Sequence, residues 1–429
     1  MSTSGGDRRV AERDAAGRAR HRWGWLALAL VTVIAVALVV VAAVAPGTFR
    51  SVFVLPGALP PSAVPSVRTS PQPSPTGSAA RTLDACVAAD LAGMSLEAQV
   101  GQLLMVGTKV DSPAALATTV SRYHLGGVFL QGRSSATAAT LHQGVAALQS
   151  AATGAGGIPL QIGVDQEGGE VQTLKGTDFP AVPTAVEQGR LGRATLGART
   201  ADMARRLLPA GITIDLAPVA DTVPPAYLGS NPPIAGFDRQ YGSDPAVVAN
   251  DISTVVTAMQ STGLLTTAKH FPGLGRVHAN TDTSTDAVDS LTTVDDPFLA
   301  PFAAAVRAGT AAVMISLATY PKLDPNSVAA FSTPIVTGLL RQRLGFTGLV
   351  ISDDMGAAKA VASVPAGQRA VRFIQAGGDM VLTVQSADAA PMSAALLAQA
   401  QSSTQFRAQV TAAAGRVLRS KFRAGLLNC

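Results

Sequence analysis

Aromatic and charged residues are scarce in this chain. Only 4% of its 429 residues are aromatic and 14% are charged, whereas 47% are hydrophobic. There are two cysteines, and no CxxC or HExxH motif occurs, so the spacings that mark common zinc and dithiol sites are missing. A phosphate-binding P-loop, a GxGxxG fingerprint and an internal repeat are missing as well. The sequence therefore predicts neither a metal site nor an organic cofactor.

The formal net charge of +5 is concentrated near the start of the chain. Residues 1–22 contribute +3 and residues 23–82 contribute another +3, which leaves −1 for the remaining residues. A nearly neutral domain with few aromatic side chains lacks both the basic surface that attracts phosphates and the platforms on which bases stack. We therefore expect no nucleic-acid partner.

Residues 23–45 form an uncharged apolar run, WGWLALALVTVIAVALVVVAAVA. This length can span a bilayer as one helix, with Trp23 and Trp25 at the interface and the preceding arginines in the cytoplasm. The run predicts a single-pass signal anchor in the cell membrane, with residues 1–22 as a basic cytoplasmic tail. The alternative is a signal peptide cleaved after the A-x-A of Ala43 and Ala45, which would make the protein secreted. Both interpretations place the rest of the chain outside the cytoplasm.

A linker and one large domain follow this run. Residues 46–82 are rich in Pro, Ser and Thr without hydrophobic periodicity, which predicts an extended, semi-rigid spacer. Residues 83–429 then form the domain, and Cys86 and Cys429 lie near its two ends. Outside the cytoplasm a disulfide between these cysteines is expected, whereas in a cytosolic protein they would be two separate thiols.

The domain alternates short β-branched runs with longer amphipathic runs rich in Ala and Leu. Helical patterns occur, for example, at residues 138–152, 245–262, 297–308 and 333–344. Eight strand–helix units in about 345 residues are what a (β/α)8 barrel of the TIM type requires. A doubly wound open sheet is the alternative. The eight candidate strands are residues 103–107, 127–131, 160–165, 212–219, 264–270, 311–317, 348–353 and 379–383.

Polar residues gather directly after four of these candidate strands, at residues 165–170, 215–221, 269–286 and 352–354. In a closed barrel the carboxyl ends of all strands open on one face, where such folds keep their active sites. The four groups are therefore predicted to converge. The richest of them, KHFPGLGRVHANTDTSTD from Lys269, places a Lys, two His, an Asn and two Asp among Gly and Pro.

Each candidate residue also has a purely structural interpretation. Asp353 and Asp354 are adjacent at the end of a strand, so their side chains point to opposite faces and only one can reach a site. A Ser-Asp pair at this place also suits a helix N-cap. Asp165 and its acidic neighbours could form a solvated turn, and Arg239 could be an exposed charge in a loop.

Taken together, several segments resemble glycoside hydrolase family 3, and within it the branch of β-N-acetylglucosaminidases that act on sugars derived from peptidoglycan. These segments occur in the family's order over nearly all of the region from about residue 96 to residue 383. They are VDQEGGEVQ, DLAPVADT, FDRQYG, KHFPGLG, AAVMIS with PKLDP, and GLLRQRLGFTGLVISDD.

The resemblance implies a single barrel without metal or organic cofactor, acting on an amino-sugar glycan of the cell-wall type. The family's nucleophile is the first carboxylate of its Ser-Asp motif, which is Asp353 here. In such enzymes it forms a covalent glycosyl-enzyme in a retaining double displacement. Asp165, Arg239, Lys269 and His270 match the positions that bind the sugar hydroxyls in relatives.

The sequence departs from the family where the acid/base group belongs. Relatives carry Asp-Ser-His in the loop after KHFPGHG, with the His as the acid/base, but Asn280, Thr281 and Asp282 occupy these positions here. Three hypotheses follow. Asp282 carries the proton itself, with its pKa raised by burial and by the charge of Asp353; His278 swings into the role; or the enzyme is weakened.

Two further departures lie at the sugar-binding end. Leu274 replaces the second His of KHFPGHG, and Glu170 and Thr173 replace two arginines of the family's GGRVQR. Without these arginines, a preference for anionic muropeptides is not implied. A carboxylate in place of a neutral His beside the acceptor also disfavours phosphate and favours water.

The sequence as a whole predicts a membrane-tethered, monomeric, retaining glycosidase of the β-N-acetylhexosaminidase type outside the cytoplasm. Its catalytic residues would be Asp353 with either Asp282 or His278. The alternatives are a catalytically impaired protein that only binds wall glycans, and a broader β-glucosidase.

Overall fold

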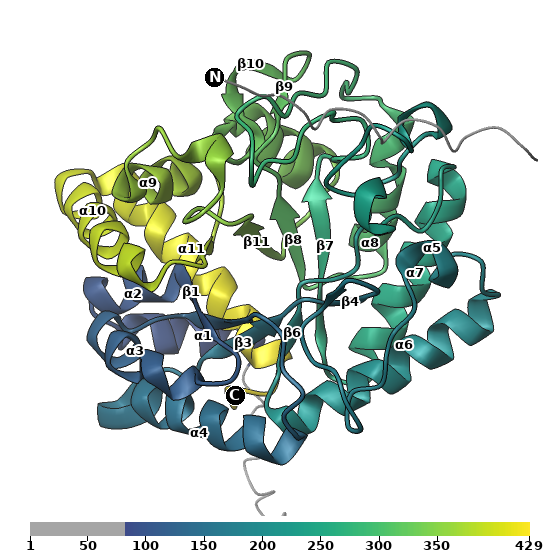
Figure 1. Cartoon of the computed structure of the whole chain (residues 1–429). Coiled ribbons are helices and arrows are strands. Elements are labelled where there is room, and N and C mark those ends of the chain that lie inside the picture. Colours follow the sequence, from purple (N-terminus) through teal and green to yellow (C-terminus); the bar gives the residue numbers. More distant parts are fainter. Residues whose placement is uncertain (1–81) are drawn as a thin grey trace, which may run out of the picture. The chain divides into compact units, whose positions relative to one another are not determined.

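The structure, a computed structural model, describes residues 82–429 (Figure 1). The predicted cytoplasmic tail, the anchor at residues 23–45 and the linker up to residue 81 lie outside the described residues. Within residues 82–429, no helix combines the length and the apolar character needed to cross a bilayer.

Eight parallel strands form a nearly closed barrel, and their order around the sheet follows their order in the chain. β12 pairs with β1, and a parallel bridge between Ile351 and Met380 joins the last two strands. The predicted TIM-like barrel is confirmed, and the alternative of a doubly wound sheet is wrong, because such a sheet reverses its strand order. The barrel strands are β1 (Leu104–Lys109), β2 (Gly127–Gln131), β3 (Gln161–Val164), β6 (Ile214–Asp215), β7 (Leu265–Phe271), β8 (Ala312–Ile315), β11 (Leu349–Ser352) and β12 (Val381–Thr383).

Two small antiparallel pairs extend the loops that follow barrel strands. β4 (Gln166–Gly168) pairs with β5 (Val171–Gln172) after β3, and β9 (Thr319–Tyr320) pairs with β10 (Asp324–Val328) after β8. Both pairs therefore belong to the face on which the strands' carboxyl ends open.

Helices surround the barrel, and all four helical patterns predicted from the sequence are helical (Figure 1). In α7, the Asp244 side chain accepts the amides of Ala246 and Val247, and a proline occupies the first helical position, which explains where this helix begins. The helices include α1 (Leu83–Ala92), α2 (Leu96–Gln102), α3 (Ala117–Tyr123), α4 (Ala138–Thr153), α5 (Ala185–Gln188), α6 (Arg193–Leu207), α7 (Pro245–Gln260), α8 (Ala300–Arg307), a π-helix (Pro334–Arg343), α9 (Ala366–Ala376), α10 (Ala389–Ser402) and α11 (Thr404–Arg423).

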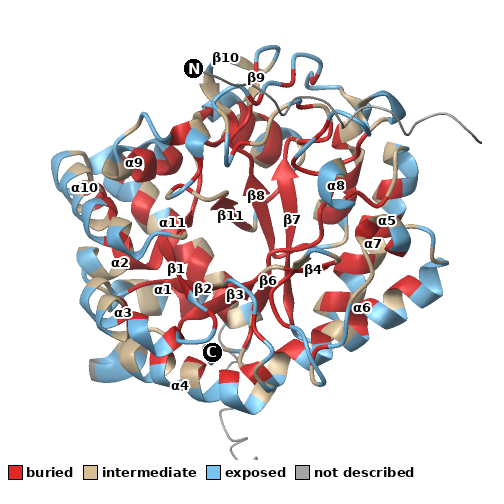
Figure 2. Ribbon diagram, in the orientation of Figure 1, coloured by how far each residue is buried: buried red, intermediate tan, exposed pale blue. Residues whose placement is uncertain are grey.

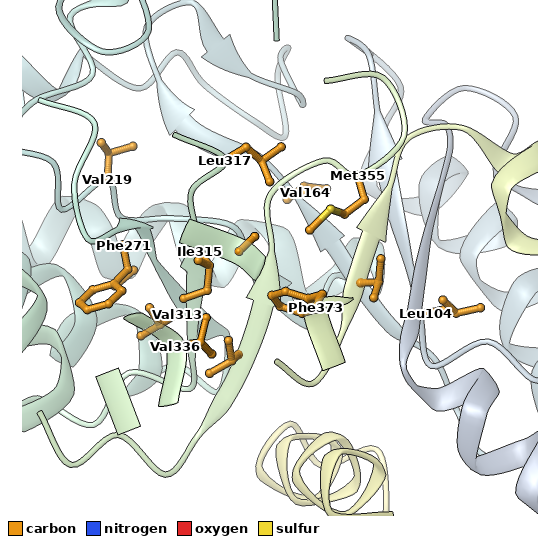
Figure 3. Packing of buried hydrophobic residues seen from close by; sticks show 14 of the residues in the cluster. Leu104, Val164, Val219, Phe271, Val313, Ile315, Leu317, Val336, Met355 and Phe373 are labelled. Carbon is orange, nitrogen blue, oxygen red and sulfur yellow. The ribbon is translucent and has the colours of Figure 1, made fainter. Parts of the chain in front are cut away.

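Alternate side chains of each barrel strand point into the barrel or out toward the helices. In β8, Ala312 and Met314 belong to the core inside the barrel, whereas Val313 and Ile315 belong to the larger core between sheet and helices. Figure 3 shows Val313 and Ile315 near Val336 of the π-helix. Burial follows the strands and the inner sides of the helices (Figure 2). Since both faces of the strands are apolar, charged side chains concentrate at the strand ends.

The first described helix and the last residue of the chain are joined covalently. Cys86 in α1 and Cys429 form a disulfide with their Cα atoms 5.5 Å apart, and α1 also packs against α11. The disulfide predicted from the sequence is confirmed. It closes residues 86–429 into one covalent ring.

Candidate active site

A cavity of about 400 Å3 opens at the carboxyl ends of the barrel strands. Asp165 follows β3, Lys269 and His270 lie near the end of β7, and Asp353 follows β11. Of the seven side chains predicted to bind substrate or act on it, all of which the structure describes, only His278 does not line this cavity. The six that do are Asp165, Arg239, Lys269, His270, Asp282 and Asp353.

Glu167, in β4, holds the two cations of the site. Its carboxylate accepts two hydrogen bonds of 2.8 Å from Arg239, and Lys269 Nζ lies 2.5 Å from Glu167 Oε1 and 2.6 Å from Asp165 Oδ1. Burial alone would raise the pKa of Glu167, but the charges of Arg239 and Lys269 outweigh it and bring that pKa to about 2. Glu167 is therefore ionised at any physiological pH, and it keeps both cations in fixed positions.

Asp221 orients His270. Its Oδ2 lies 2.7 Å from His270 Nδ1, and Oδ1 accepts the backbone amide of Leu274 at 2.7 Å. Because the carboxylate accepts the Nδ1–H, the other ring nitrogen is left as an acceptor, and Arg239 Nη2 lies 3.4 Å from it. Asp221 itself is completely buried. The His270 ring is thus fixed from both sides.

Asp215, at the end of β6, adds a neutral carboxyl group to this region. One of its oxygens accepts the Gln166 amide at 3.0 Å, and the other has no hydrogen-bond partner within the described chain. Burial raises the pKa of Asp215 to about 8, against the lowering effects of the Gln166 amide and of Lys269. At neutral pH the group is protonated, so it leaves the charge balance around Lys269 unchanged.

The adjacent carboxylates Asp353 and Asp354 have different surroundings. Asp354 accepts three backbone amides, from Gly356 and Ala357 at 2.8 Å and from Val384 at 2.9 Å. Asp353 accepts the Asp354 amide at 2.9 Å and faces the cavity. Both residues line the cavity, contrary to the expectation that only one of them would reach it. The cap-like role that the sequence left open falls to Asp354, and the Asp353 carboxylate remains available to a substrate.

Asp282 reaches the cavity from the long connection between β7 and α8. The backbone of this connection is fastened to the segment after Asp353, because the amides of Lys359 and Ala360 donate to the carbonyls of Asp282 and Thr281 at 3.3 and 3.0 Å. Asp282 is exposed to solvent, and its side chain also lies among the groups that line the cavity. Burial, and next the negative charge of Asp353, raise the pKa of Asp282 to about 6.

His278 lies outside the cavity. Its exposed ring stacks on Tyr227 with the ring centroids 5.0 Å apart, and its Nδ1 is 3.3 Å from the carbonyl oxygen of Ser230. The structure therefore does not bring His278 together with Asp353. A catalytic role for His278 requires the ring to leave Tyr227, and it stays a prediction.

The positions that depart from the family pattern supply no additional cation. Leu274 is buried and contributes an apolar wall to the cavity. Glu170 is exposed, and only its backbone carbonyl is engaged by Arg133, at 2.6 Å. Thr173 is buried, with its amide donating to the Asp165 carbonyl at 2.9 Å. Of the β4–β5 hairpin, Val171 lines the cavity, whereas Glu170 and Thr173 do not.

Sequence reasoning did not single out Glu167 and Asp221, although both lay in segments marked as polar. For Glu167 a signal existed: residues two apart in an extended segment share a face, so Glu167 points to the same side as Asp165. Both do reach Lys269. For Asp221 no such signal exists, because its partner His270 is 49 residues further along the chain.

The cavity combines a carboxylate, a second carboxyl group that keeps a proton up to about pH 6, and cations in fixed positions. A nucleophilic carboxylate paired with a proton-donating one is the arrangement that glycosidases use to displace a sugar from its anomeric oxygen. Within residues 82–429, no group of three or more His, Cys, Asp or Glu is placed to hold a metal ion.

Known proteins resemble this chain over most of its length. The sequence model of the family described as "Glycosyl hydrolase family 3 N terminal domain" matches residues 95–420. The beta-hexosaminidase of Nitrosomonas eutropha is 34% identical over 276 residues, which cover 62% of this chain and 75% of that protein. Beta-hexosaminidase LpqI of Mycobacterium tuberculosis is 33% identical over 297 residues, covering 67% of this chain and 72% of that protein.

A solved structure gives the same result. The crystal structure of a beta-N-acetylhexosaminidase from Beutenbergia cavernae superposes with a TM-score of 0.74 and 45% sequence identity, covering 77% of this chain and 99% of that one. A family match over more than half of the sequence agrees with the barrel and with the carboxylate cavity at its mouth. The chain therefore belongs to glycoside hydrolase family 3 and is a glycosidase.

Proposed function

We propose that this glycosidase cleaves β-linked N-acetylglucosamine by a retaining mechanism, with Asp353 as the nucleophile and Asp282 as the acid/base. The relatives named above are hexosaminidases, which supports an N-acetylated hexosamine as the sugar. One observation carries the assignment of roles. Asp282 shares the cavity with Asp353, and burial and the Asp353 charge raise its pKa to about 6.

In the first step an Asp353 oxygen attacks the anomeric carbon, and the bond from that carbon to the leaving oxygen breaks. Asp282 gives its proton to that oxygen, so the aglycone departs as a neutral alcohol and the sugar remains as an ester of Asp353. Lys269 donates to sugar hydroxyls and Asp165 accepts from them. Since Glu167 already holds Lys269, the cation needs no rearrangement when substrate binds.

After the first step Asp282 is a carboxylate, and it stays ionised because the ester of Asp353 carries no negative charge that would raise its pKa. The Asp282 carboxylate takes a proton from a water molecule, whose oxygen bonds to the anomeric carbon as the ester bond to Asp353 breaks. An ionised Asp282 beside the acceptor repels phosphate. Hydrolysis rather than phosphorolysis is therefore the outcome that the site favours.

The same proposal covers the natural substrate and the position of the domain. A cell-wall glycan is the source of the sugar, and the domain is tethered to the outer face of the membrane. The uncharged run at residues 23–45 supports the tether, and the Cys86–Cys429 disulfide suits an oxidising compartment. Glu170 and Thr173, in place of arginines, favour neutral leaving groups over anionic ones.

The test uses full-length protein in detergent and three substrates. These are 4-nitrophenyl N-acetyl-β-glucosaminide, the matching glucoside, and an N-acetyl-β-glucosaminide with a simple alkyl leaving group. Asp353→Asn should lose nearly all activity on both N-acetylglucosaminides. Asp282→Asn should lose about 100-fold or more on the alkyl substrate and far less on the nitrophenyl one, which needs no proton. Asp286→Asn is the matched control, since Asp286 is an exposed carboxylate in the same loop outside the cavity.

Product stereochemistry separates the two roles further. With azide present, Asp353→Gly should give the α-glycosyl azide, because azide takes the place of the nucleophile. Asp282→Gly should give the β-glycosyl azide from the nitrophenyl substrate, because azide attacks the intermediate on Asp353. The opposite pairing of products would reverse the assignment.

Other results would favour the other functions. If the wild type turns over no substrate between about pH 4 and 8 but binds N-acetylglucosamine saturably, it is a glycan-binding protein. Faster turnover of the glucoside would make it a broader β-glucosidase. Equal losses for Asp282→Asn on both leaving groups would contradict acid/base catalysis by this residue.

A further inference from the structure

The acid loop, residues 277–288, carries Asp282. Val277, Thr281 and Ala287 of this loop are buried, but its tip at residues 282–286 is not. Four of the five side chains from Asp282 to Asp286 are exposed. The tip is held by the two backbone hydrogen bonds from residues 359 and 360 described above. Loops with so few buried contacts open easily unless they are anchored elsewhere. The position of Asp282 therefore depends on how the two ends of the loop are fixed.

Each end of the loop has its own anchor, since Asn231 Nδ2 donates to the Val277 carbonyl at 2.9 Å and the Thr319 amide donates to the Ala287 carbonyl at 2.9 Å. One arginine joins the two ends to each other. Arg276 precedes the acid loop and Asp289 follows it, and Arg276 Nε lies 3.2 Å from Asp289 Oδ2. Arg276 Nη2 also donates to Asp296 at 2.7 Å and to Thr292 at 2.5 Å, and its guanidinium lies 4.5 Å from the centroid of the Phe298 ring. Only 10% of the Arg276 side chain is exposed. Charge-assisted contacts shielded to this degree hold geometry far better than a surface ion pair.

The partners of Arg276 are themselves fixed to the barrel. Asp289 accepts the Thr292 amide at 3.0 Å, and its own amide donates to the Thr319 carbonyl in β9 at 3.0 Å. Asp296 caps the short helical turn that leads into α8. Arg276 thus connects the near end of the acid loop to two anchored points, one on the β9 side and one at the start of α8.

We propose that Arg276 is a positioning residue for catalysis, which closes the base of the acid loop and thereby holds Asp282 in the cavity with Asp353. Arg276 does not line the cavity, so it acts on the reaction only through the loop. The inference rests on the proposed role of Asp282 as the acid/base.

A lysine cannot take over this role. The arginine fork reaches Asp289, Thr292 and Asp296 with two different nitrogens, whereas an ammonium group is a single point at the end of a flexible chain. With lysine the base of the loop opens more often, and Asp282 spends less time in the cavity. Proton donation to the leaving oxygen suffers, while attack by Asp353 is unaffected.

The test compares three variants of the full-length protein on the alkyl and the nitrophenyl N-acetylglucosaminides. Arg276→Lys should lower kcat/KM about 10- to 100-fold on the alkyl substrate and about threefold or less on the nitrophenyl one. Asp296→Asn keeps the helix cap, since Asn is a good N-cap residue, but it loses the charge that faces Arg276. It should show the same pattern with a smaller loss, about three- to tenfold. It also serves as the milder variant should Arg276→Lys fold poorly.

Arg341→Lys is the matched control. Arg341 also makes a 2.7 Å ion pair to a buried aspartate, Asp379, and 15% of its side chain is exposed, but it lies in the π-helix away from the cavity. Its replacement should lower stability without any dependence on the leaving group. The inference is overturned if Arg276→Lys, like Arg341→Lys, loses the same fraction of its activity on the alkyl and the nitrophenyl substrates. It is also overturned if Arg276→Lys loses no activity.

Hydrogen exchange distinguishes failure of this inference from failure of the proposed function. Peptides covering residues 277–288 and 357–362 should exchange about tenfold faster in Arg276→Lys and unchanged in Arg341→Lys. Unchanged exchange in both Arg276→Lys and Asp296→Asn refutes the positioning role whatever the activity. If exchange is faster but activity falls equally on both leaving groups, Arg276 holds the loop without affecting proton donation. The activities of Asp282→Asn on the same two substrates then show whether the acid/base assignment itself has failed.

Discussion

Removing the charge of Asp353 should lower the pKa of Asp282 without returning it to its ordinary value. That pKa stands at about 6 instead of 3.8, with burial as the largest cause and Asp353 as the next. Asp353→Asn removes the second cause and keeps the first. Two like charges about 4 Å apart in water interact by about 1 kcal/mol, or about 0.7 pH units, and partial exclusion of water increases this. We therefore expect a fall of about one pH unit.

Carbon-13 NMR of protein labelled at its aspartate carboxyl groups measures this pKa directly. The Asp282 signal is identified by its loss in Asp282→Asn and titrated in the wild type, in Asp353→Asn and in Asp286→Asn. The last is the control, because Asp286 is not among the charges that shift Asp282. The same fall should follow when a slow fluorinated N-acetylglucosaminide esterifies Asp353, since the ester is neutral.

The pKa of Asp282 should also appear in the pH dependence of kcat/KM. For the alkyl substrate, kcat/KM should fall about tenfold per pH unit above about pH 6, as Asp282 loses its proton. Asp282→Asn should lack this alkaline limb. An Asp282 pKa that does not change when Asp353 is neutralised would show that the two carboxyl groups do not sense each other. That result would refute the pairing on which the proposed mechanism rests.

Three further predictions concern stability. Lys269→Met should lower the free energy of unfolding by about 3 kcal/mol, which urea unfolding measures. It should also raise the pKa of Glu167 from about 2, because Glu167 loses one of its two cations. An unchanged Glu167 pKa in an NMR titration would contradict the pairing. Asp215→Asn should become increasingly more stable than wild type as pH rises from about 4 to 8. Because the pKa of Asp215 is raised to about 8 in the folded protein, its carboxyl group ionises between about pH 4 and 8 in the unfolded chain but not in the folded one. If the difference in unfolding free energy between the variant and the wild type does not change with pH, Asp215 does not have this raised pKa. Reducing the Cys86–Cys429 disulfide should lower stability by about 5 kcal/mol, because it spans 343 residues of chain; a melting temperature unaffected by reductant, with Cys86→Ser as the reference, would count against this.

Much of the fold was accessible from the sequence because the barrel's two periodicities are local. Apolar β-branched runs between amphipathic ones located all eight barrel strands, several to within a residue or two. The exception is informative. The run at 212–219 predicted a long strand, but β6 is only Ile214–Asp215, since Pro218 has no amide to donate to a strand ladder. Beyond β6 the backbone still contacts β7, since the amides of Thr267 and Lys269 donate to the carbonyls of Ala217 and Pro218, and Val219 forms a bridge with Lys269.

From its motifs and their order, the sequence indicated the family, favoured the barrel over an open sheet, and supplied seven candidate site residues. The folded structure showed that six of the seven meet in the cavity, with Asp282 inside it and His278 outside, and it separated the roles of the two adjacent carboxylates. Asp354 differs from Asp353 because the Val384 amide reaches it from beyond β12.

Other decisions of the same kind concern residues whose partners lie far along the chain. Glu167 holds Arg239 from 72 residues away, and His278 is occupied by stacking on Tyr227. Arg276, in contrast, binds partners in its own β7–α8 connection, 13 to 20 residues further along the chain. Pairings between loops of different strands form only when the barrel closes, so no local pattern in the sequence could predict them.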